Sequence, residues 1–493
     1  MSAVSIPVII CALSPLLVAA AILFKRPLKR PAASTVLITS WTAATILLAA
    51  HVGNLIADQT FLEVFGSRML IVDTPSCLML TLIGFISLIT IKYSYNYLEG
   101  NGQQKLFICK LGLLTALIVL LATANNLYLM ALSWCLTTPL LVTMLTQNKT
   151  KTAHVAAKRM LGHHLIADTC FLGALCLLAN QDHDIATLNA HLLANPDQLS
   201  NYALVSSLLT MAALIKSAVF PLHSWLLGSL EAPTPLSAFL HAGVVNIAGF
   251  LGLRFAPLLT TPYLGGNMLI AFGLISAVLG AACSIVQPDV KRKLVYSTVA
   301  QMGFMCLQCG IGALHAALFH LIFHGCFKCY LFLSAGGAIA SAKSQKHGPA
   351  GIGLARGLTT ALLSMACCWV SLNNSPAIFL PATILTVSLI FEYLCLEVKQ
   401  TPSRAQKLKP TATDLFLLTV LPCTVLIVAY AGGCDFFASY VVHGLESGMA
   451  GAILITFGCL MLAAWTAIRS RYKNAIKDWL YVLALNGGYL TRQ

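Results

Sequence analysis

Long apolar runs recur from one end of the chain to the other, and they constrain its fold more than any other feature. Each run has roughly 18–22 residues, which as a helix is long enough to cross a hydrocarbon core of about 30 Å. Only 9% of the 493 residues are charged and 58% are hydrophobic, whereas soluble proteins carry about 25% charged residues. The sequence therefore predicts an all-α polytopic membrane protein.

The lengths of these runs predict about 15 transmembrane helices. The expected spans are 3–24, 33–50, 69–91, 106–124, 126–146, 161–180, 203–220, 234–256, 265–287, 294–311, 313–340, 357–373, 377–396, 412–431 and 449–468. The first run lacks the basic start and the cleavage site of a signal peptide, so we expect it to be retained. The loops reach only about 20 residues, too few for a core of their own. Residues 1–493 are therefore expected to form a single transmembrane domain.

Basic and acidic residues alternate between successive loops. The basic clusters at 25–30, 149–159, 291–293, 343–356, 399–409 and 469–477 all fall on one side of the predicted membrane. The loops on the other side hold Asp58, Glu63, Asp182, Asp184, Asp197, Asp435 and Glu446. Because cytoplasmic loops collect Lys and Arg, we expect the N-terminus outside and the C-terminus in the cytoplasm. The same bias explains the net charge of +14 without a nucleic-acid partner.

Two residues of opposite charge lie on consecutive predicted spans, Asp168 on the sixth and Lys216 on the seventh. A charge at the bilayer centre costs at least about 2.5–3.5 kcal/mol, so pairing would offset the cost of burying both. Pro221 follows Lys216 and must end or kink the helix there. A broken helix beside a charge is typical of ion sites in transporters. We interpret Lys216 as a switchable proton or charge carrier, with a static ion pair as the alternative.

Two histidines and a lysine repeat every fourth residue in the eleventh span. His320, His324 and Lys328 therefore share one helix face. This stripe suits a proton relay because histidine titrates near neutral pH, but polar contacts between helices are an alternative. Zinc binding would need a third protein ligand, which is not evident nearby. His241 in the eighth span and Glu392 in the thirteenth are also ionisable at membrane depth, although Glu392 is equally well explained as an interfacial charge.

Four cysteines reproduce the spacing of a zinc ribbon, as the pairs Cys306/Cys309 and Cys326/Cys329. The two pairs lie on predicted helices that are joined by a turn near 310–312. Cys309 is about 2 residues from that turn and Cys326 about 15, so their depths differ by roughly 20 Å. They are not expected to share an ion, and no metal site or cofactor is predicted. The 17 cysteines behave as small hydrophobic residues in this setting.

Three stretches resemble the antiporter-like subunits of respiratory complex I and of Mrp sodium/proton antiporters. They are "KSAVFPLHSWLLGSLEAPTPLSAFLHAGVV" from Lys216, "DVKRKLVYSTVAQMGFM" from Asp289 and "FHLIFHGCFKCYLFLSAG" from Phe319. The resemblance covers roughly residues 70–400. It implies two inverted five-helix repeats, at about 106–256 and 265–396, each with a broken helix. It also implies a proton path along the membrane midplane.

The resemblance assigns a cation pathway residue by residue. Lys216 matches the lysine of the family's seventh helix, Asp168 an aspartate on the sixth and His241 the polar position on the eighth. The candidate pathway that follows is Asp168, Lys216, Glu231, His241, Lys291, His320, His324 and Lys328. Glu231 lies inside the first matching stretch, and the last four residues correspond to the relay of the second repeat. No residue is assigned a catalytic role, so the chain is predicted to be a transport subunit and not an enzyme.

Two departures from the family pattern bear on function. Cys135 stands where the family has a glutamate after tryptophan on the fifth helix, and "WVSLNNSPAIFLP" at 369–381 lacks the lysine of the broken twelfth helix. With these losses the chain resembles the DabB family, the membrane subunits of two-component inorganic-carbon pumps of bacteria. That resemblance implies a bacterial inner membrane and a DabA-like zinc-containing partner that is driven by H+ or Na+ flow. A proton-pumping subunit of a complex I-type NADH:quinone oxidoreductase and a Mrp-type Na+/H+ antiporter subunit are the alternatives.

Overall fold

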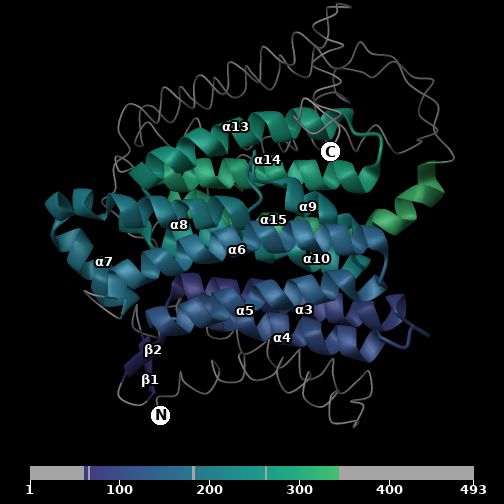
Figure 1. Ribbon diagram of the computed structural model, residues 1–493, viewed down its shortest axis with the longest axis horizontal. Helices are drawn as coiled ribbons and strands as arrows, with labels where there is room; N and C mark the ends of the chain where they lie inside the picture. Colours follow the sequence, from purple (N-terminus) through teal and green to yellow (C-terminus); the bar gives the residue numbers. More distant parts are fainter. Residues whose placement is uncertain (1–59, 65–66, 180–183, 261–263, 343–493) are drawn as a thin grey trace, which may run out of the picture.

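The computed structural model describes residues 60–64, 67–179, 184–260 and 264–342 (Figure 1). Within these ranges, eight helical segments are long and apolar enough to cross a membrane. The prediction of a helical, multi-pass membrane protein is confirmed. The first two predicted spans, the twelfth to fifteenth spans and Glu392 lie outside the described residues.

The described helices run nearly parallel to one another as a bundle (Figure 1). They are α3 (Thr74–Tyr97), α4 (Gln104–Thr123), α5 (Leu127–Leu145), α6 (Lys151–Ala179), α7 (Ile185–Ala194), α8 (Ala203–Lys216), α9 (Ser224–Leu227), α10 (Thr234–Ala242), α11 (Ile247–Arg254), α12 (Ala256–Leu259), α13 (Leu264–Val286), α14 (Val290–Gly310) and α15 (Leu314–Ala342). Short 3-10 helices lie between them: η1 (Thr146–Asn148), η2 (Pro196–Tyr202), η3 (Gly228–Glu231) and η4 (Val244–Asn246). The predicted spans 106–124, 126–146 and 265–287 match α4, α5 and α13 to within two residues at each end.

Side-chain caps set several helix starts. The Asp73 carboxylate accepts a hydrogen bond from Ser76 N at 2.9 Å and begins α3. Asn126 caps α5 in the same way through Tyr128 N, and Asp289 caps α14 through Arg292 N at 2.7 Å. Each cap satisfies an amide that has no partner inside its helix, so the start of the helix is fixed by a polar residue beside the apolar run.

Two spans begin earlier than the sequence predicts. Helix α6 begins at Lys151 and not near residue 161, and α14 begins at Val290 and not near residue 294. In both cases the extra turns carry basic residues, such as Lys158, Arg159 and Lys291. A span predicted from hydropathy ends at the first charged residues. The helix itself continues past them, because long basic side chains can extend to the membrane interface.

The eighth predicted span, 234–256, is broken in the structure. It is divided into α10 and α11 by η4, with Gly243 as the C-cap of α10. Gly243 donates its N–H to Phe239 O at 2.9 Å, and the Asn246 side chain donates to Ala242 O at 2.7 Å. The glycine and the asparagine therefore close the end of α10 within the membrane. Two breaks, after α8 and after α10, thus lie in consecutive crossings.

A β-hairpin and a short helix were not predicted. Strands β1 (Thr60–Val64) and β2 (Ser67–Val72) pair antiparallel just before α3. Asn125 ties them to the turn between α4 and α5, because its N–H donates to Met69 O at 3.0 Å and its side chain to Arg68 O at 3.1 Å. Helix α7 occupies a segment that was expected to be a loop. Both additions cap one end of the bundle, which we call the hairpin end (left in Figure 1).

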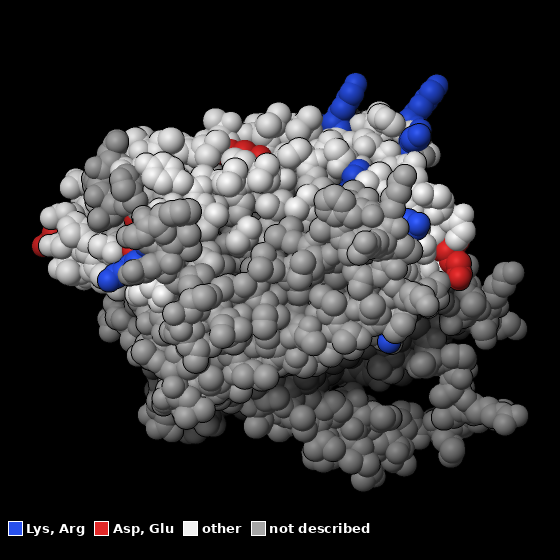
Figure 2. All heavy atoms as spheres, turned by 90° about the horizontal axis from the view of Figure 1, so that it is seen from below, with Lys and Arg blue, Asp and Glu red and all other residues white. Residues whose placement is uncertain are grey.

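The opposite end of the bundle carries the basic turns, and we call it the basic end. It is formed by the turns after α3, α5 and α13, and Lys149 and Lys291 lie there. Figure 2 shows most of the visible Lys and Arg atoms gathered at this end. The hairpin end carries Asp184 at the start of α7. Within the described residues, basic and acidic loops thus lie at opposite ends of the bundle, as the alternation of loop charges in the sequence predicts.

Helices α13 and α14 pack with their backbones in close approach. A Cβ added at Gly273 would lie 2.6 Å from Gly303 O, and one added at Gly280 would lie 2.6 Å from Ala300 N. Only glycine allows two helix backbones to approach so closely. In a membrane the hydrophobic effect does not drive helices together, so close packing at such small residues stabilises their association. The pair forms a rigid support for the broken helix α8, because Ser276 of α13 bonds to the chain beyond the break.

Candidate ion-translocation site

Helix α8 ends at Lys216, where the sequence predicts a break. Ser217 is the C-cap, Ala218 has a left-handed φ of 53°, and the Phe220–Pro221 peptide is cis. Lys216 lies thirteen residues after Ala203, the first residue of α8, and therefore about 20 Å from the hairpin end of this helix. The break is thus near the middle of the crossing.

Polar groups freed by the break find partners in the protein. Ile215 O accepts from the Trp225 indole at 2.8 Å, and Phe220 N donates to Ser276 Oγ at 3.0 Å. The Ser217 hydroxyl accepts from Ala248 N of α11 at 2.9 Å. Irregular backbone at membrane depth is tolerated only against protein or a wet cavity. These bonds meet that condition for the polar groups at the end of α8.

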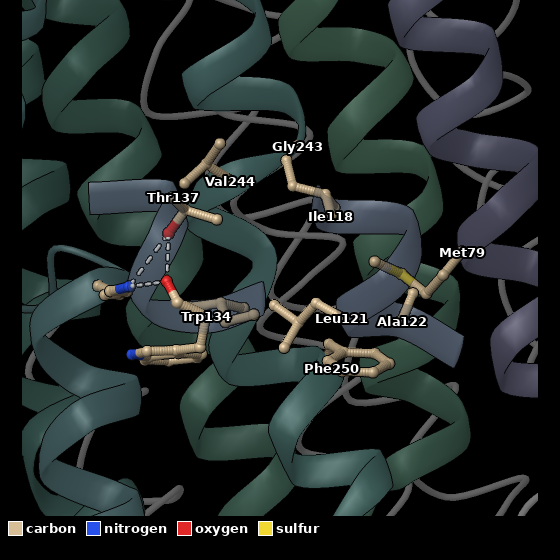
Figure 3. Close-up of a pocket in the computed structure, with 11 residues that line it drawn as sticks. Met79, Ile118, Leu121, Ala122, Trp134, Thr137, Gly243, Val244 and Phe250 are labelled. Carbon is tan, nitrogen blue, oxygen red and sulfur yellow. Dashed lines mark hydrogen bonds between the residues drawn. The ribbon is translucent and has the colours of Figure 1, made fainter. Parts of the chain in front are cut away.

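The structure brings Lys216 and Asp168 together. Lys216 Nζ lies 2.9 Å from Asp168 Oδ1, and the side chains are 3% and 10% exposed. The ammonium also donates to Trp134 O at 3.2 Å and Thr137 Oγ1 at 3.3 Å, as the dashed lines in Figure 3 show. The second Asp168 oxygen accepts from Thr138 at 2.7 Å. Three helices, α5, α6 and α8, therefore hold one buried ion pair.

Helix α5 forms a wall of this site. The Trp134 ring lies 4.1 Å from Lys216 Nζ, close enough for a cation–π contact, and it stacks on Phe171 of α6. Cys135, which stands where the resemblance places a glutamate, is half-buried. The aromatic ring and backbone carbonyl of the preceding residue thus supply negative potential to Lys216 where a second carboxylate is missing.

A small cavity opens beside Lys216. Its volume is about 30 Å³, room for one or two waters. The lining is mostly apolar and comes from α3, α4, α5, α8, η4 and α11 and from the end of α10: Met79, Ile118, Leu121, Ala122, Trp134, Thr137, Lys216, Gly243, Val244, Ile247 and Phe250. Figure 3 shows Thr137 and Trp134 on one side of the cavity and Phe250 and Met79 on the other. The cavity therefore joins the break after α8 to the break between α10 and α11.

A second polar cluster lies between α10, α14 and α15. His241 is fully buried, with Nε2 3.0 Å from Ser229 Oγ and Nδ1 3.1 Å from Thr298 Oγ1. Lys328, also fully buried, donates to Ser297 Oγ at 2.9 Å. Hydroxyl groups that both donate and accept surround this histidine and lysine, which is the composition that a proton path needs.

His320 and His324 continue that polar cluster along α15. Their rings are 5.9 Å apart between centroids, in an edge-to-face arrangement. His320 Nδ1 lies 3.0 Å from Gln308 Oε1, and His324 Nδ1 lies 3.0 Å from Asn246 Oδ1 in the break between α10 and α11. The stripe predicted from the spacing of these residues is therefore buried, and it contacts the second break.

Two predicted pathway residues lie apart from the buried clusters. Glu231 is exposed and accepts from Thr152 Oγ1 at 2.7 Å. Lys291 is half-exposed and donates to Thr234 Oγ1 at 3.4 Å. Both lie at the basic end, near the start of α10. Neither residue therefore belongs to the buried clusters.

Asp73 and Arg254 form a second buried ion pair that the sequence did not reveal. Arg254 Nη1 lies 2.8 Å from Asp73 Oδ2, and Nη2 donates to Ser76 Oγ and Ala122 O at 2.7 and 2.6 Å. Asp73 lies near the start of the predicted span 69–91 and Arg254 near the end of the predicted span 234–256, and neither was singled out. A signal was present, because an arginine inside the predicted span 234–256 requires a buried acidic partner.

His164 is a further buried group that the sequence did not single out. Its ring is fully buried on α6, and neither ring nitrogen has a hydrogen-bond partner in the described part of the protein. It precedes Asp168 by four residues, so both lie on one helix face. That spacing was available as a signal, but the position fell near the expected start of the span, where a histidine is unremarkable.

The zinc-ribbon spacing of four cysteines does not form a site. Cys306 and Cys309 lie on α14, and Cys326 and Cys329 lie on α15, all as free thiols. Across residues 60–64, 67–179, 184–260 and 264–342, no three His, Cys, Asp or Glu side chains are grouped for a metal ion.

Known proteins similar to this chain include membrane transport subunits. The chain is 36% identical over 287 residues to "Probable inorganic carbon transporter subunit DabB1" of Halothiobacillus neapolitanus, covering 57% of this chain and 51% of the relative. It is 30% identical over 383 residues to DabB2 of the same organism, covering 73% and 69%. It is 34% identical over 294 residues to the chloroplastic NAD(P)H-quinone oxidoreductase subunit 5 of Acorus calamus var. americanus, covering 58% and 39%. The chain thus spans about half the length of DabB1.

Two solved structures share the fold. One is the membrane-bound sulfane sulfur reductase, an archaeal respiratory membrane complex, with a TM-score of 0.62 and 15% identity over 99% of this chain and 98% of the other. The second is the Mrp complex from Dietzia sp. DQ12-45-1b, with a TM-score of 0.60 and 22% identity over 98% and 59%. The family described as "NADH:quinone oxidoreductase/Mrp antiporter, TM" matches residues 124–394, more than half of the sequence. The chain therefore belongs to the transmembrane antiporter family of NADH:quinone oxidoreductases and Mrp antiporters.

Proposed function

We propose that this chain is the ion-conducting membrane subunit of an energy-coupled inorganic-carbon pump. The observation that supports ion conduction is the Lys216–Asp168 pair, buried at the end of the broken helix α8. Similarity to DabB1 and DabB2 supports inorganic carbon as the cargo of the complex. H+ or Na+ would move down its gradient through the chain, and this flow would drive a DabA-like zinc-containing partner.

The proposed pathway starts at the ion pair. Lys216 holds a proton while Asp168 is ionised beside it, and it releases the proton when the pair separates or Asp168 is neutralised. His241, Lys328, His324 and His320 would continue the path through α10 and α15, with hydroxyl groups and transient water between them. Glu231 and Lys291 would lie on the approach from the basic end. The breaks after Lys216 and at 243–246 supply the backbone freedom that separation needs.

The wider architecture belongs to the same proposal. About 15 transmembrane helices would form one domain over residues 1–493, with inverted repeats at about 106–256 and 265–396. The chain would lie in a bacterial inner membrane with its N-terminus periplasmic and its C-terminus cytoplasmic. CO2 hydration would occur in the zinc-containing partner, so this chain would be a translocating subunit and not an enzyme. A basic, cytoplasmic end follows from the loop charges.

Growth rescue tests the carbon function directly. Co-expressed with its partner, the chain should restore growth in ambient air to a bacterial strain that lacks carbonic anhydrase. Lys216→Ala or Asp168→Asn should abolish rescue while the two proteins still co-purify, because the surviving charge has lost its counter-ion. Lys92→Ala, at an exposed lysine of α3, is the matched control and should rescue fully. Absence of rescue by the wild-type pair, with both proteins in the membrane, would refute the function.

Lys216→Arg separates a proton carrier from a fixed charge. Arginine keeps the positive charge but does not release its proton in proteins. A carrier role predicts that the arginine variant assembles and fails to support uptake. Uptake at the wild-type rate would instead show that Lys216 only supplies a static charge to Asp168.

The second candidate function is a proton-pumping subunit of a complex I-type NADH:quinone oxidoreductase. The 34% identity to NAD(P)H-quinone oxidoreductase subunit 5 favours it. Cys135 in place of a glutamate argues against it, because the seventh-helix lysine then has only one carboxylate partner. Proton uptake driven by NADH in inverted membrane vesicles would support this candidate. Sodium-dependent proton efflux in the absence of NADH and inorganic carbon would support a Mrp-type antiporter.

A further inference from the structure

We propose that His164 is a proton-carrying residue that connects Lys216 to the basic end through a seam between α6 and α9. This role deepens the ion conduction proposed above and depends on it. His164 has no partner on either ring nitrogen within the described residues, although its side chain is completely buried. Leaving such a group unpaired in the protein interior has a cost in stability. Exchange of protons along the proposed path would explain why His164 is retained in spite of this cost.

The position of His164 is set by the same elements that set the ion pair. Four residues before Asp168 on α6, it lies about 6 Å closer to the basic end along the helix axis. Its ring meets the Trp225 ring edge-to-face, with centroids 4.5 Å apart. The Trp225 indole donates to Ile215 O, one residue before Lys216. One tryptophan therefore contacts both the last turn of α8 and the histidine.

The next residue, His163, extends the route toward the surface. It is half-buried, and its Nε2 lies 3.2 Å from Ser224 Oγ, while Nδ1 contacts Arg159 O at 2.9 Å. Ser224 and Trp225 are adjacent in α9, so this short helix contacts both His163 and His164. A hydroxyl that can donate and accept lies beside the outer histidine, which suits transfer of a proton from His164 toward solvent.

Helix α9 is held against α6 by close packing. A Cβ at Gly228, just after α9, would lie 2.9 Å from the Cβ of Ala156. The segment after the break therefore has little room to move away from α6. This fixed seam is built by the sequence immediately after Lys216, so the helix break that frees Lys216 also places Ser224 and Trp225 beside the histidines.

The transfer itself requires no other reactant. The proton leaves Lys216 Nζ, which becomes a neutral amine, and it reaches a ring nitrogen of His164 directly or through a water, forming imidazolium. His164 then returns to the neutral state by passing the proton toward Ser224 and His163. Lys216, Asp168 and His163 are the charged or titratable groups that adjoin it on α6 and α8. Repulsion between two positive charges in a poorly solvated interior disfavours protonation of Lys216 and His164 at once, so the proton is passed and not accumulated.

Proton flux in proteoliposomes tests this role, with the full chain reconstituted together with its partner. A potassium diffusion potential drives the flux, and a trapped pH-sensitive dye reports it. His164→Gln is nearly isosteric and keeps hydrogen bonding, but it cannot carry a proton. We expect its flux to fall about a hundredfold, the lower end of the range for loss of a proton-transfer group. Co-purification with the partner shows that the variant is folded.

Chemical rescue separates proton transfer from packing. His164→Ala should lose flux and regain it when imidazole is added, whereas His164→Phe, which fills the space, should not respond. His154→Ala changes an exposed histidine of the same helix and should conduct like the wild type. Flux near the wild-type value in His164→Gln would overturn the inference, and so would a loss in His164→Ala that imidazole leaves unchanged.

Lys216→Ala in the same assay distinguishes this inference from the function that it depends on. Normal flux in Lys216→Ala would remove the proposed conduction route altogether. If Lys216→Ala does not conduct protons but His164→Gln does, conduction through Lys216 is supported and only the role of the α6–α9 seam is rejected.

Discussion

Replacing Arg254 by methionine should strongly destabilise the protein without acting on the Lys216 site. The Arg254 guanidinium donates to Asp73, to Ser76 and to Ala122 O over 2.6–2.8 Å. At 2.8 Å and an effective dielectric of about 20, the attraction between the two charges is about 6 kcal/mol. Much of this offsets the cost of burying both ions, but methionine removes the attraction and leaves the Asp73 charge buried.

The expected loss in the free energy of unfolding is about 3–5 kcal/mol, the range for breaking a buried pair on one side. At roughly 2 °C per kcal/mol, a value for large domains, the midpoint of thermal unfolding should fall by about 6–10 °C. The assay is the temperature at which the monodisperse peak of the detergent-purified complex disappears. Arg68→Met, at an exposed arginine of β2, is the control and should stay within about 0.5 kcal/mol of wild type.

A double variant makes the reasoning refutable. Asp73→Asn with Arg254→Met removes both charges, and asparagine still caps α3. Its stability should therefore exceed that of Arg254→Met alone, because no uncompensated charge remains. A double variant that is less stable than Arg254→Met would show that the two residues do not act as a pair. An Arg254→Met protein as stable as the wild type would show that the pair does not hold α3 to α11.

Two other predictions follow from contacts at the site and its support. Gly280→Val should prevent the close approach of α13 and α14, because even a Cβ would lie 2.6 Å from Ala300 N. The yield of folded protein should therefore be low. Gly162→Val is the control, since a Cβ there meets nothing within 4 Å, and its yield should be normal. Thr138→Val removes the donor to Asp168 Oδ2. A hydrogen bond to a charge contributes about 1.5–3 kcal/mol, so the rate of inorganic-carbon uptake should fall by about ten- to a hundredfold. Unchanged uptake in a well-expressed Thr138→Val protein would mean that this bond does not tune the ion pair.

The sequence predicts the centre of the site because its signals are local. Lys216 and Pro221 are five residues apart in an apolar run, and a proline after a buried lysine indicates both a charge and a break. The spacing of His320, His324 and Lys328 predicts a shared helix face for the same reason. A periodicity of 3.6 residues is a property of one helix, so it can be interpreted without knowing which helices are neighbours.

Pairings between distant helices could not be predicted in this way. Asp73 and Arg254 are 181 residues apart, so an arginine in an apolar run predicts an acidic partner but not which residue it is. The break at 243–246 was also missed, since Gly243 and Asn246 lie in a run that is long enough for one continuous span. The sequence predicts which residues are costly to bury, whereas their partners depend on the tertiary arrangement.

The two buried ion pairs differ in how completely they are bonded, and this difference bears on which of them can carry ions. Arg254 is held by three short contacts of 2.6–2.8 Å and joins the end of α11 to the start of α3. Lys216 has one short contact with Asp168, two longer ones of 3.2 and 3.3 Å, and a cavity beside it. A pair that must open repeatedly cannot be saturated with strong bonds, because each bond adds to the barrier for separation. Lys216, at the end of a helix that has already been broken, has fewer short contacts to break before it gives up its proton, so the weaker of the two pairs is the one suited to transport.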